Sequence, residues 1–249
     1  MNVWSITDVG VVRSQNQDSC KVTRLSDDQM ILVVCDGMGG ARAGNVASEL
    51  AVGAFCDAVL ERLADPEQAE NIPAILKDST ALANRVVCHR SYTDRECLGM
   101  GTTLVAALVS GGKIHLANVG DSRAYLISED GIRQVTRDHS LVQDMVMRGE
   151  ITPEQARTHP QKNLITRALG AAETVGVDLY EEDLQAGAFL LLCTDGLSNV
   201  MTDQEILYEV MHGGEPEECC QRMLDIVLQR GAPDNVTAVL LQMAENADA

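Results

Sequence analysis

Short, unbroken apolar runs bounded by turn residues predict buried strands in this chain. The run over residues 30–35 (MILVVC) stops at Asp36-Gly37, and the run over residues 189–194 (FLLLCT) stops at Asp195-Gly196. A continuous apolar run of this length is typical of a strand that is covered on both faces. We therefore expect two buried strands, each with an aspartate at its end.

A second group of strands follows the pattern of hairpins. Strands are expected over residues 102–109 and 114–119, joined by a Gly111-Gly112 turn, and then over 123–127 and 132–135, joined by a Ser-Glu-Asp-Gly turn. Short connections of this kind join antiparallel neighbours. The pattern indicates an antiparallel meander.

Three segments show the spacing of three to four residues between apolar positions that predicts helices with one buried face. They cover residues 45–63, about 72–87 and about 216–229, with Pro216 suited to a first helical turn and Gly231 to a C-terminal stop. The helices stand between groups of strands and do not alternate with single strands, which favours an α+β fold over a doubly wound parallel sheet. We expect a layered sandwich in which helices cover the outer faces of stacked sheets.

The composition is that of an ordinary globular protein, with 249 residues of which 45% are hydrophobic and 22% charged. No repeat or linker divides the chain, so we expect one domain over residues 1–249. No apolar run approaches the roughly 20 residues of a membrane span, and the start lacks a signal pattern, which predicts a cytoplasmic protein without membrane insertion. We also expect a monomer. Eight cysteines without a Cys-x-x-Cys pair predict reduced, mostly buried thiols and no structural zinc site.

The charge balance limits the partners. Lys and Arg number 19 against 37 Asp and Glu, a formal net charge of −18. This disfavours nonspecific binding to nucleic acid or to an anionic membrane. An anionic substrate must find local positive charge, which bound metal ions could supply.

Five aspartates lie at the ends of apolar strands or in tight turns beside them: Asp18, Asp36, Asp121, Asp195 and Asp234. Each one alone is more simply a turn residue. Strand ends that meet at one edge of a sandwich would crowd the five carboxylates, and a hard divalent cation removes that repulsion. The histidines are scattered and no calcium-loop pattern occurs, so the predicted occupants are two magnesium or manganese ions.

A glycine-rich segment over residues 36–44 follows a predicted strand and precedes a predicted helix. Arg42 occupies the third position of the dinucleotide fingerprint, and no Gly-Lys-Ser/Thr follows, which excludes a Rossmann loop and a P-loop. Its glycines would let a backbone carbonyl approach a metal. Arg13, which alone suggests a surface salt bridge, is in this acidic setting a candidate clamp for a phosphoryl group.

Several motifs in order carry a family resemblance: Val9-Gly10, Arg13-Ser14-Gln15-Asn16-Gln17-Asp18, Asp36-Gly37-Met38-Gly39-Gly40, Gly99-Met100-Gly101-Thr102-Thr103, Val119-Gly120-Asp121-Ser122-Arg123, Arg137-Asp138-His139-Ser140, Ile165-Thr166-Arg167-Ala168-Leu169-Gly170, Thr194-Asp195-Gly196-Leu197 and Asp234-Asn235-Val236-Thr237. Through them the chain resembles the metal-dependent protein phosphatases of the PPM family, also called type 2C Ser/Thr phosphatases, and in particular their single-domain bacterial members. The resemblance covers the chain nearly from end to end.

The resemblance implies a four-layer α-β-β-α sandwich with a metal centre at one edge of two central antiparallel sheets. It implies two core Mn²⁺ or Mg²⁺ ions. Asp36 would bridge them, the Gly37 carbonyl would bind one, and Asp195 and Asp234 would complete the second.

Three further roles follow from the same resemblance. Asp18 would orient a metal-bound water, Asp121 together with Asp195 would hold a weaker third ion, and Arg13 would grip the substrate phosphate. The implied reaction is hydrolysis of phosphoserine and phosphothreonine in phosphorylated proteins by a metal-bridging hydroxide, without a phosphoenzyme. Such an enzyme would oppose a bacterial Ser/Thr kinase.

Two positions depart from the pattern of many relatives. Met38 stands where a histidine is often cast as the general acid, and it cannot donate a proton, which leaves a metal-bound water or His139 as alternatives. Gln17 replaces a frequent glutamate and would make one metal-water contact neutral. Residues 140–167, with a short helix followed by a polar segment, correspond to the flap beside the active site.

Two other functions use the same features. A catalytically silent member would bind phosphorylated segments as a regulatory module, although Asp36, Asp195 and Asp234 are all present. A hydrolase of small phosphate esters would share the centre and differ in the outer groove. The acidic surface, which chiefly favours solubility, suggests in addition a bias toward basic phosphosites.

Overall fold

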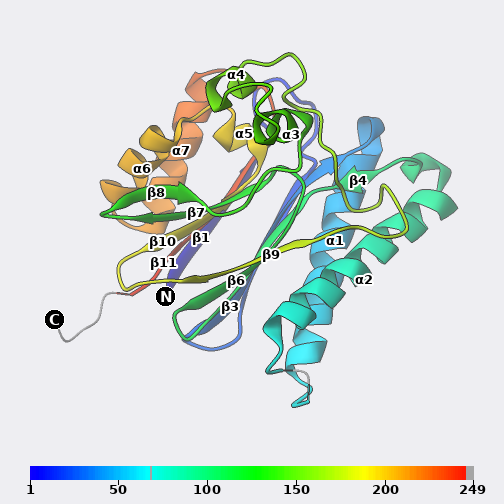
Figure 1. Cartoon of the computed structure of the whole chain (residues 1–249), viewed down its shortest axis with the longest axis horizontal. Coiled ribbons are helices and arrows are strands. Elements are labelled where there is room, and N and C mark those ends of the chain that lie inside the picture. Colours follow the sequence, from blue (N-terminus) through cyan, green and yellow to red (C-terminus); the bar gives the residue numbers. More distant parts are fainter. Residues whose placement is uncertain (68, 245–249) are drawn as a thin grey trace.

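The computed structural model describes residues 1–67 and 69–244, with the backbone alone for residues 40–42. Two antiparallel sheets stack face to face, and helices cover both outer faces (Figure 1). The four-layer α-β-β-α sandwich that the family resemblance implies is confirmed. All pairings between named strands are antiparallel, in agreement with the hairpin pattern.

Sheet I has the strand order β1-β11-β10-β7-β8, and sheet II has the order β2-β3-β5-β6-β9, with β4 paired to β3. The strands of sheet I are β1 (Asn2–Asp8), β7 (Arg123–Ser128), β8 (Gly131–Gln134), β10 (Phe189–Cys193) and β11 (Val236–Gln242). Those of sheet II are β2 (Asp18–Arg24), β3 (Gln29–Met38), β4 (Gly101–Thr102), β5 (Leu104–Ser110), β6 (Lys113–Val119) and β9 (Asp178–Asp183).

The two long helices α1 (Gly40–Leu63) and α2 (Ile72–Thr93) cover sheet II, while α6 (Asp203–Met211) and α7 (Pro216–Gln229) cover sheet I (Figure 1). The short helices α3 (Leu141–Met147), α4 (Pro153–Arg157) and α5 (Asp195–Ser198) gather at one edge of the sandwich, at the top of Figure 1. A 3₁₀ turn, η1 (Arg95–Cys97), follows α2.

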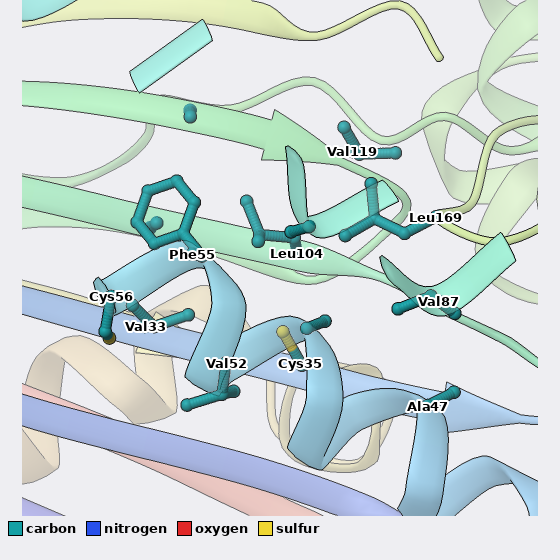
Figure 2. Packing of buried hydrophobic residues seen from close by; sticks show 14 of the residues in the cluster. Val33, Cys35, Ala47, Val52, Phe55, Cys56, Val87, Leu104, Val119 and Leu169 are labelled. Carbon is teal, nitrogen blue, oxygen red and sulfur yellow. The ribbon is translucent and has the colours of Figure 1, made fainter. Parts of the chain in front are cut away.

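Strand β3 shows why residues 30–35 are apolar at every position. Ile31, Val33 and Cys35 pack against α1 and α2, in the cluster that contains Phe55 (Figure 2). The alternate residues, from Met30 to Val34, pack between the two sheets. Because successive side chains of a strand point to opposite faces, a strand covered on both faces has no polar side.

Helix α1 begins at Gly40, five residues before the predicted start, and α2 continues to Thr93, beyond the predicted end. By length and mean hydropathy (1.2), the part of α1 over Ala43–Leu63 could cross a membrane, which corrects the expectation that no segment approaches such a length. More than half of it is buried in the sandwich, mostly against β3 and α2. Helix α7 has the predicted bounds.

Other elements differ from the sequence pattern. Strand β3 continues through Asp36 to Met38, so its aspartate lies within the strand and not after it. Four strands were not predicted, namely β1, β2, β9 and β11. The apolar positions of β1, β2 and β9 are few or interrupted, whereas β11 carries an apolar run (VTAVLLQ) that the sequence analysis did not assign. All eight thiols are free, and seven are buried.

Candidate active site

The register between β2 and β3 brings the first two acidic residues together. Asp18 pairs directly with Asp36 across the two strands. The side chains two and four residues before Asp36 in β3, and those two and four residues after Asp18 in β2, pack between the sheets. Because alternate residues of a strand share one face, both aspartates also point into the space between sheets I and II. Both lie close enough to Asp195, the first residue of α5, for its charge to act on them.

Sheet I approaches the same edge with its own acidic residues. Asp195 is the first residue of α5, directly after β10, and Asp234 lies two residues before β11. Thr194 ties the sheets together, because its Oγ1 donates to Asp18 Oδ2 at 2.9 Å and accepts from the Thr237 N–H at 3.0 Å. The edge therefore collects carboxylates from both sheets.

Two threonines hold the backbone at Asp36. Its N–H donates to Thr103 Oγ1 at 2.9 Å, and its carbonyl accepts from the Thr103 N–H and from Thr102 Oγ1, both at 2.9 Å. Thr103 Oγ1 also lies 2.6 Å from Ser122 Oγ, next to Asp121. The position of Asp36 is thus coupled to the turn that carries Asp121.

Gly37 fits where no side chain can. A Cβ at this position would stand 2.0 Å from the Gly44 carbonyl oxygen and 2.5 Å from that of Gln17. The Gly37 N–H donates to the same Gln17 oxygen at 3.1 Å. The close approach keeps this backbone at the surface of the acidic edge.

Burial and like charge dominate the electrostatics. Burial raises the pKa of Asp36 well above its usual range, and the four other carboxylates raise it further. Burial raises the pKa of Asp18 to about 7 against the opposing effect of the Thr237 and Thr194 side chains, and that of Asp121 to about 8. The pKa of Asp195 is raised by burial and then by Asp234.

This cluster fits divalent cations. Its donors are oxygens, and Asp18 Oδ1 and Asp195 Oδ1 are buried without a hydrogen-bond partner in the described part of the chain. Within residues 1–67 and 69–244, no three His, Cys, Asp or Glu side chains already converge in ligand geometry.

A cleft of about 440 Å³ opens over the acidic edge and is lined by Asp36, Gly37, Met38 and Asp234 together with Arg13. The Arg13 guanidinium donates from Nη2 to Asp234 Oδ2 at 2.7 Å. The predicted phosphate clamp thus lies at the mouth of the predicted metal centre.

Asn235 organises the loops around this cleft, a role that the sequence analysis did not assign. Its Nδ2 donates to the carbonyls of Val9 and Gln15, and its Oδ1 accepts from the Gln17 N–H at 2.8 Å. The only sequence signal was its place in the motif after Asp234. Asn235 therefore holds the segment that carries Arg13 against the loop that carries Asp234.

A second cavity of about 290 Å³ lies under the flap and is lined by Asp121 and Asp195. Arg123 also lines it and makes hydrogen bonds from Nε and Nη2 to Asp138, the latter at 2.7 Å. Helix α4 covers this cavity through Pro153, Ala156 and Arg157. The structure thus divides the predicted residues between two cavities, while Asp18 lies buried between the sheets.

His139 is held away from both cavities and is 3% exposed. Its Nδ1 accepts from the Gly120 N–H at 3.0 Å, which leaves Nε2 protonated in the neutral ring and 3.2 Å from Asp178 Oδ2. Burial lowers the pKa of this imidazole. With both ring nitrogens engaged, His139 is placed to support the loop and not to protonate a leaving group.

Comparison with known sequences gives one family. A family model described as Protein phosphatase 2C matches residues 11–240. Serine/threonine phosphatase stp of Listeria innocua is 39% identical over 240 residues, which cover 95% of this chain and 93% of that protein. Serine/threonine protein phosphatase PstP of Mycobacterium tuberculosis is 38% identical over 239 residues, which cover 96% of this chain and 44% of that longer protein.

Solved structures resemble the whole sandwich. The Mycobacterium tuberculosis phosphatase PstP/Ppp superposes with a TM-score of 0.88 at 36% identity, covering 98% of this chain and 99% of that one. Stp1 of Staphylococcus aureus gives 0.88 at 38% identity, covering 97% and 94%. The catalytic domain of PstP in complex with two manganese ions gives 0.84 at 34% identity, covering 98% of both chains.

Proposed function

We propose that this chain, which belongs to the protein phosphatase 2C (PPM) family of Ser/Thr phosphatases, hydrolyses phosphoserine and phosphothreonine at the cleft that contains Arg13. One observation carries the proposal: five carboxylates from both sheets meet at one edge, with a guanidinium at its mouth. A phosphate ester needs cationic groups to bind it, and the carboxylates of this edge are suited to hold metal cations.

Two Mn²⁺ or Mg²⁺ ions would be held at this edge by Asp36, the Gly37 carbonyl, Asp195 and Asp234. A third ion would bind Asp121 and Asp195 in the cavity under the flap. Support comes from the oxygen donors, from the unpartnered oxygens of Asp18 and Asp195, and from the manganese in the related PstP structure. When bound, such ions activate water and stabilise charge on the phosphoryl oxygens.

The chain's own residues bind and orient the substrate. Arg13 is proposed to release Asp234 and bind two phosphoryl oxygens, because a guanidinium offers two parallel donors. Asp18, held by Thr194, orients the attacking water from beneath. The phosphoryl group is transferred directly to water, without a phosphoenzyme. The products are inorganic phosphate and a free Ser or Thr hydroxyl.

The proton for the leaving Ser or Thr oxygen is proposed to come from water in the cleft. Met38 lines the cleft and has no proton to give. His139 lies outside the cleft with both ring nitrogens engaged. Water is the remaining donor of the alternatives that the sequence left open.

The cellular role is part of the same proposal. Residues 1–249 form a single catalytic domain with a flap at about 140–167, and the protein acts as a cytoplasmic monomer. Its partners are phosphorylated proteins and a Ser/Thr kinase that it opposes. The names of the stp and PstP relatives support phosphorylated proteins as the substrates.

The test measures phosphate release from a phosphothreonine peptide with Mn²⁺, Mg²⁺ or EDTA. Release that depends on metal and is lost in Asp195→Asn supports the proposal. The matched control is Asp225→Asn on the exposed side of α7, where the carboxylate accepts a hydrogen bond from Gln221 Nε2 at 2.9 Å. A folded protein that binds the ions without releasing phosphate would instead be a module that binds phosphorylated segments.

A further inference from the structure

Three aliphatic side chains stand exposed on two segments that lead into the surroundings of the Arg13 cleft. Val11 and Val12, directly before Arg13, are 64% and 68% exposed, and Leu98 is 72% exposed. Single apolar residues on a surface are ordinary, but apolar side chains grouped beside a binding cleft mark a contact site. We name Val11, Val12 and Leu98 the aliphatic rim.

Contacts of Val11 and of the residues after Leu98 connect both segments of the aliphatic rim to the loops around the cleft. The Val11 N–H donates to the Ala232 carbonyl at 3.0 Å, which fixes this segment to the loop leading into the metal-binding edge. Leu98 stands two residues before Met100, and a Cβ on the cleft-lining Gly39 would lie 2.8 Å from the Met100 Cα. The rim therefore comes from two segments that are far apart in sequence and adjoin one cleft.

The charges around the cleft disfavour an acidic neighbour for the phosphoresidue. Among the described lining residues Arg13 is the one cation, and the phosphate uses it. Met38 extends the aliphatic surface into the cleft. An acidic residue beside the phosphoresidue would meet no second cation there, and the chain's net charge of −18 would repel it.

We propose that the aliphatic rim binds an aliphatic residue directly flanking the phosphoresidue of a substrate protein, so that the enzyme selects phosphosites by their neighbours. The inference rests on the proposed function of the Arg13 cleft. Burying aliphatic surface of the substrate against the rim is favourable. The valines are restricted at χ1, so they lose little freedom when they are covered.

The experiment compares phosphothreonine peptides that differ only in the residues flanking the phosphothreonine, with Val, Ser or Asp on each side in turn. The Mn²⁺-loaded wild type is expected to prefer Val over Ser by about three- to tenfold in kcat/KM, mainly through KM. Asp should be the poorest flank. The Val/Ser ratio is the kcat/KM for the peptide with a Val flank divided by that for the peptide with a Ser flank. Two variants, Val12→Thr, which keeps the branched shape, and Leu98→Ser, are each expected to move this ratio toward one.

Two controls accompany the series. Turnover of a small aryl phosphate by each variant reports the integrity of the phosphate site. Tyr208→Ser removes an equally exposed side chain, 60% exposed on α6 and outside the cleft lining, and should leave the Val/Ser ratio unchanged.

The outcomes separate the two levels of inference. Metal-dependent release with the same Val/Ser ratio in wild type, Val12→Thr and Leu98→Ser would overturn the role of the rim and leave the phosphatase proposal standing. Release from the aryl phosphate but from no phosphopeptide would overturn both. A dimer seen by light scattering in the wild type and lost in Val12→Thr would show that the rim joins two copies, which also overturns the inference.

Discussion

Arg13 Nη2 lies 2.7 Å from Asp234 Oδ2, although the two residues are 221 positions apart. One is the predicted phosphate clamp and the other a predicted metal ligand. In this arrangement the guanidinium balances the negative charge of Asp234, which a metal cation would balance when bound. Metal binding at Asp234 and phosphate binding at Arg13 are therefore expected to favour each other.

Replacing Arg13 tests this pairing. Arg13→Ala is expected to lower kcat/KM for a phosphopeptide by about 10- to 100-fold, because hydrogen bonds between charged groups contribute about 1.5–3 kcal/mol. Arg13→Lys should recover part of the loss, since it restores charge without the two parallel donors. Arg24→Ala, on an arginine that donates to the Met1 carbonyl at the start of β1, is the control. Unchanged kinetics in Arg13→Ala would contradict its role.

Gly37 and Gly53 form a matched pair of glycines. Gly37→Ala is expected to abolish metal-dependent activity and to destabilise the fold, because the new Cβ would stand 2.0 Å from the Gly44 carbonyl oxygen. Gly53 lies within α1, and a Cβ at this position would have no atom within 4 Å. Because alanine favours a helix more than glycine does, Gly53→Ala should raise the free energy of unfolding by up to about 1 kcal/mol. Urea unfolding and phosphate release on both variants check this. A fully active Gly37→Ala protein would show that the backbone can yield.

Thr194 connects sheet I to Asp18. Thr194→Val leaves the Thr237 N–H and Asp18 Oδ2 without this partner, and should lower the free energy of unfolding by about 1–3 kcal/mol. Thr194→Ser keeps the hydroxyl and should lose much less. Urea unfolding curves distinguish the two variants. Equal losses would indicate that the methyl group matters and the hydrogen bonds do not.

The buried carboxylates predict an unusual dependence of stability on pH in the metal-free protein. Burial raises the pKa of Asp18 to about 7 and that of Asp121 to about 8, so the native state keeps protons that the unfolded chain has released above about pH 4. Native protein then binds more protons than unfolded protein, and the free energy of unfolding falls as the pH rises. For Asp18 alone the decline between pH 4 and 7 is on the order of 4 kcal/mol.

Thermal unfolding from pH 5 to pH 8, with EDTA or with excess Mn²⁺, measures this effect. The window starts at pH 5 because carboxylates with lowered pKa, such as Glu205 beside Arg230, stabilise the fold above their unfolded pKa and lose that contribution only at lower pH. The melting temperature should fall with pH in EDTA and stay nearly level in Mn²⁺. A level profile in EDTA would argue against protonated carboxylates in the native state.

Much of this protein follows from local pattern. The apolar runs at residues 30–35 and 189–194 predict buried strands because both of their faces are covered. The turns between 102 and 135 correctly predict two antiparallel hairpins, but the predicted single meander is wrong, because β5 and β6 lie in sheet II while β7 and β8 lie in sheet I. Helix α7 has the predicted bounds because a proline and a glycine flank one amphipathic stretch. The family motifs supplied the layer order and the candidate residues. These signals are local, so they can be recognised without knowing what packs against them.

Tertiary structure decided the rest. The facing of Asp18 and Asp36 depends on the register of β2 against β3, and the Thr194 and Asn235 contacts depend on how the two sheets stack. The separation of Asp121 from the Arg13 cleft, and the engagement of both nitrogens of His139, depend on the flap and its neighbouring loops. The sequence alone indicated which residues are candidates to hold metal and phosphate. Their grouping required the fold, because strand register and sheet stacking arise from contacts between residues far apart in the chain.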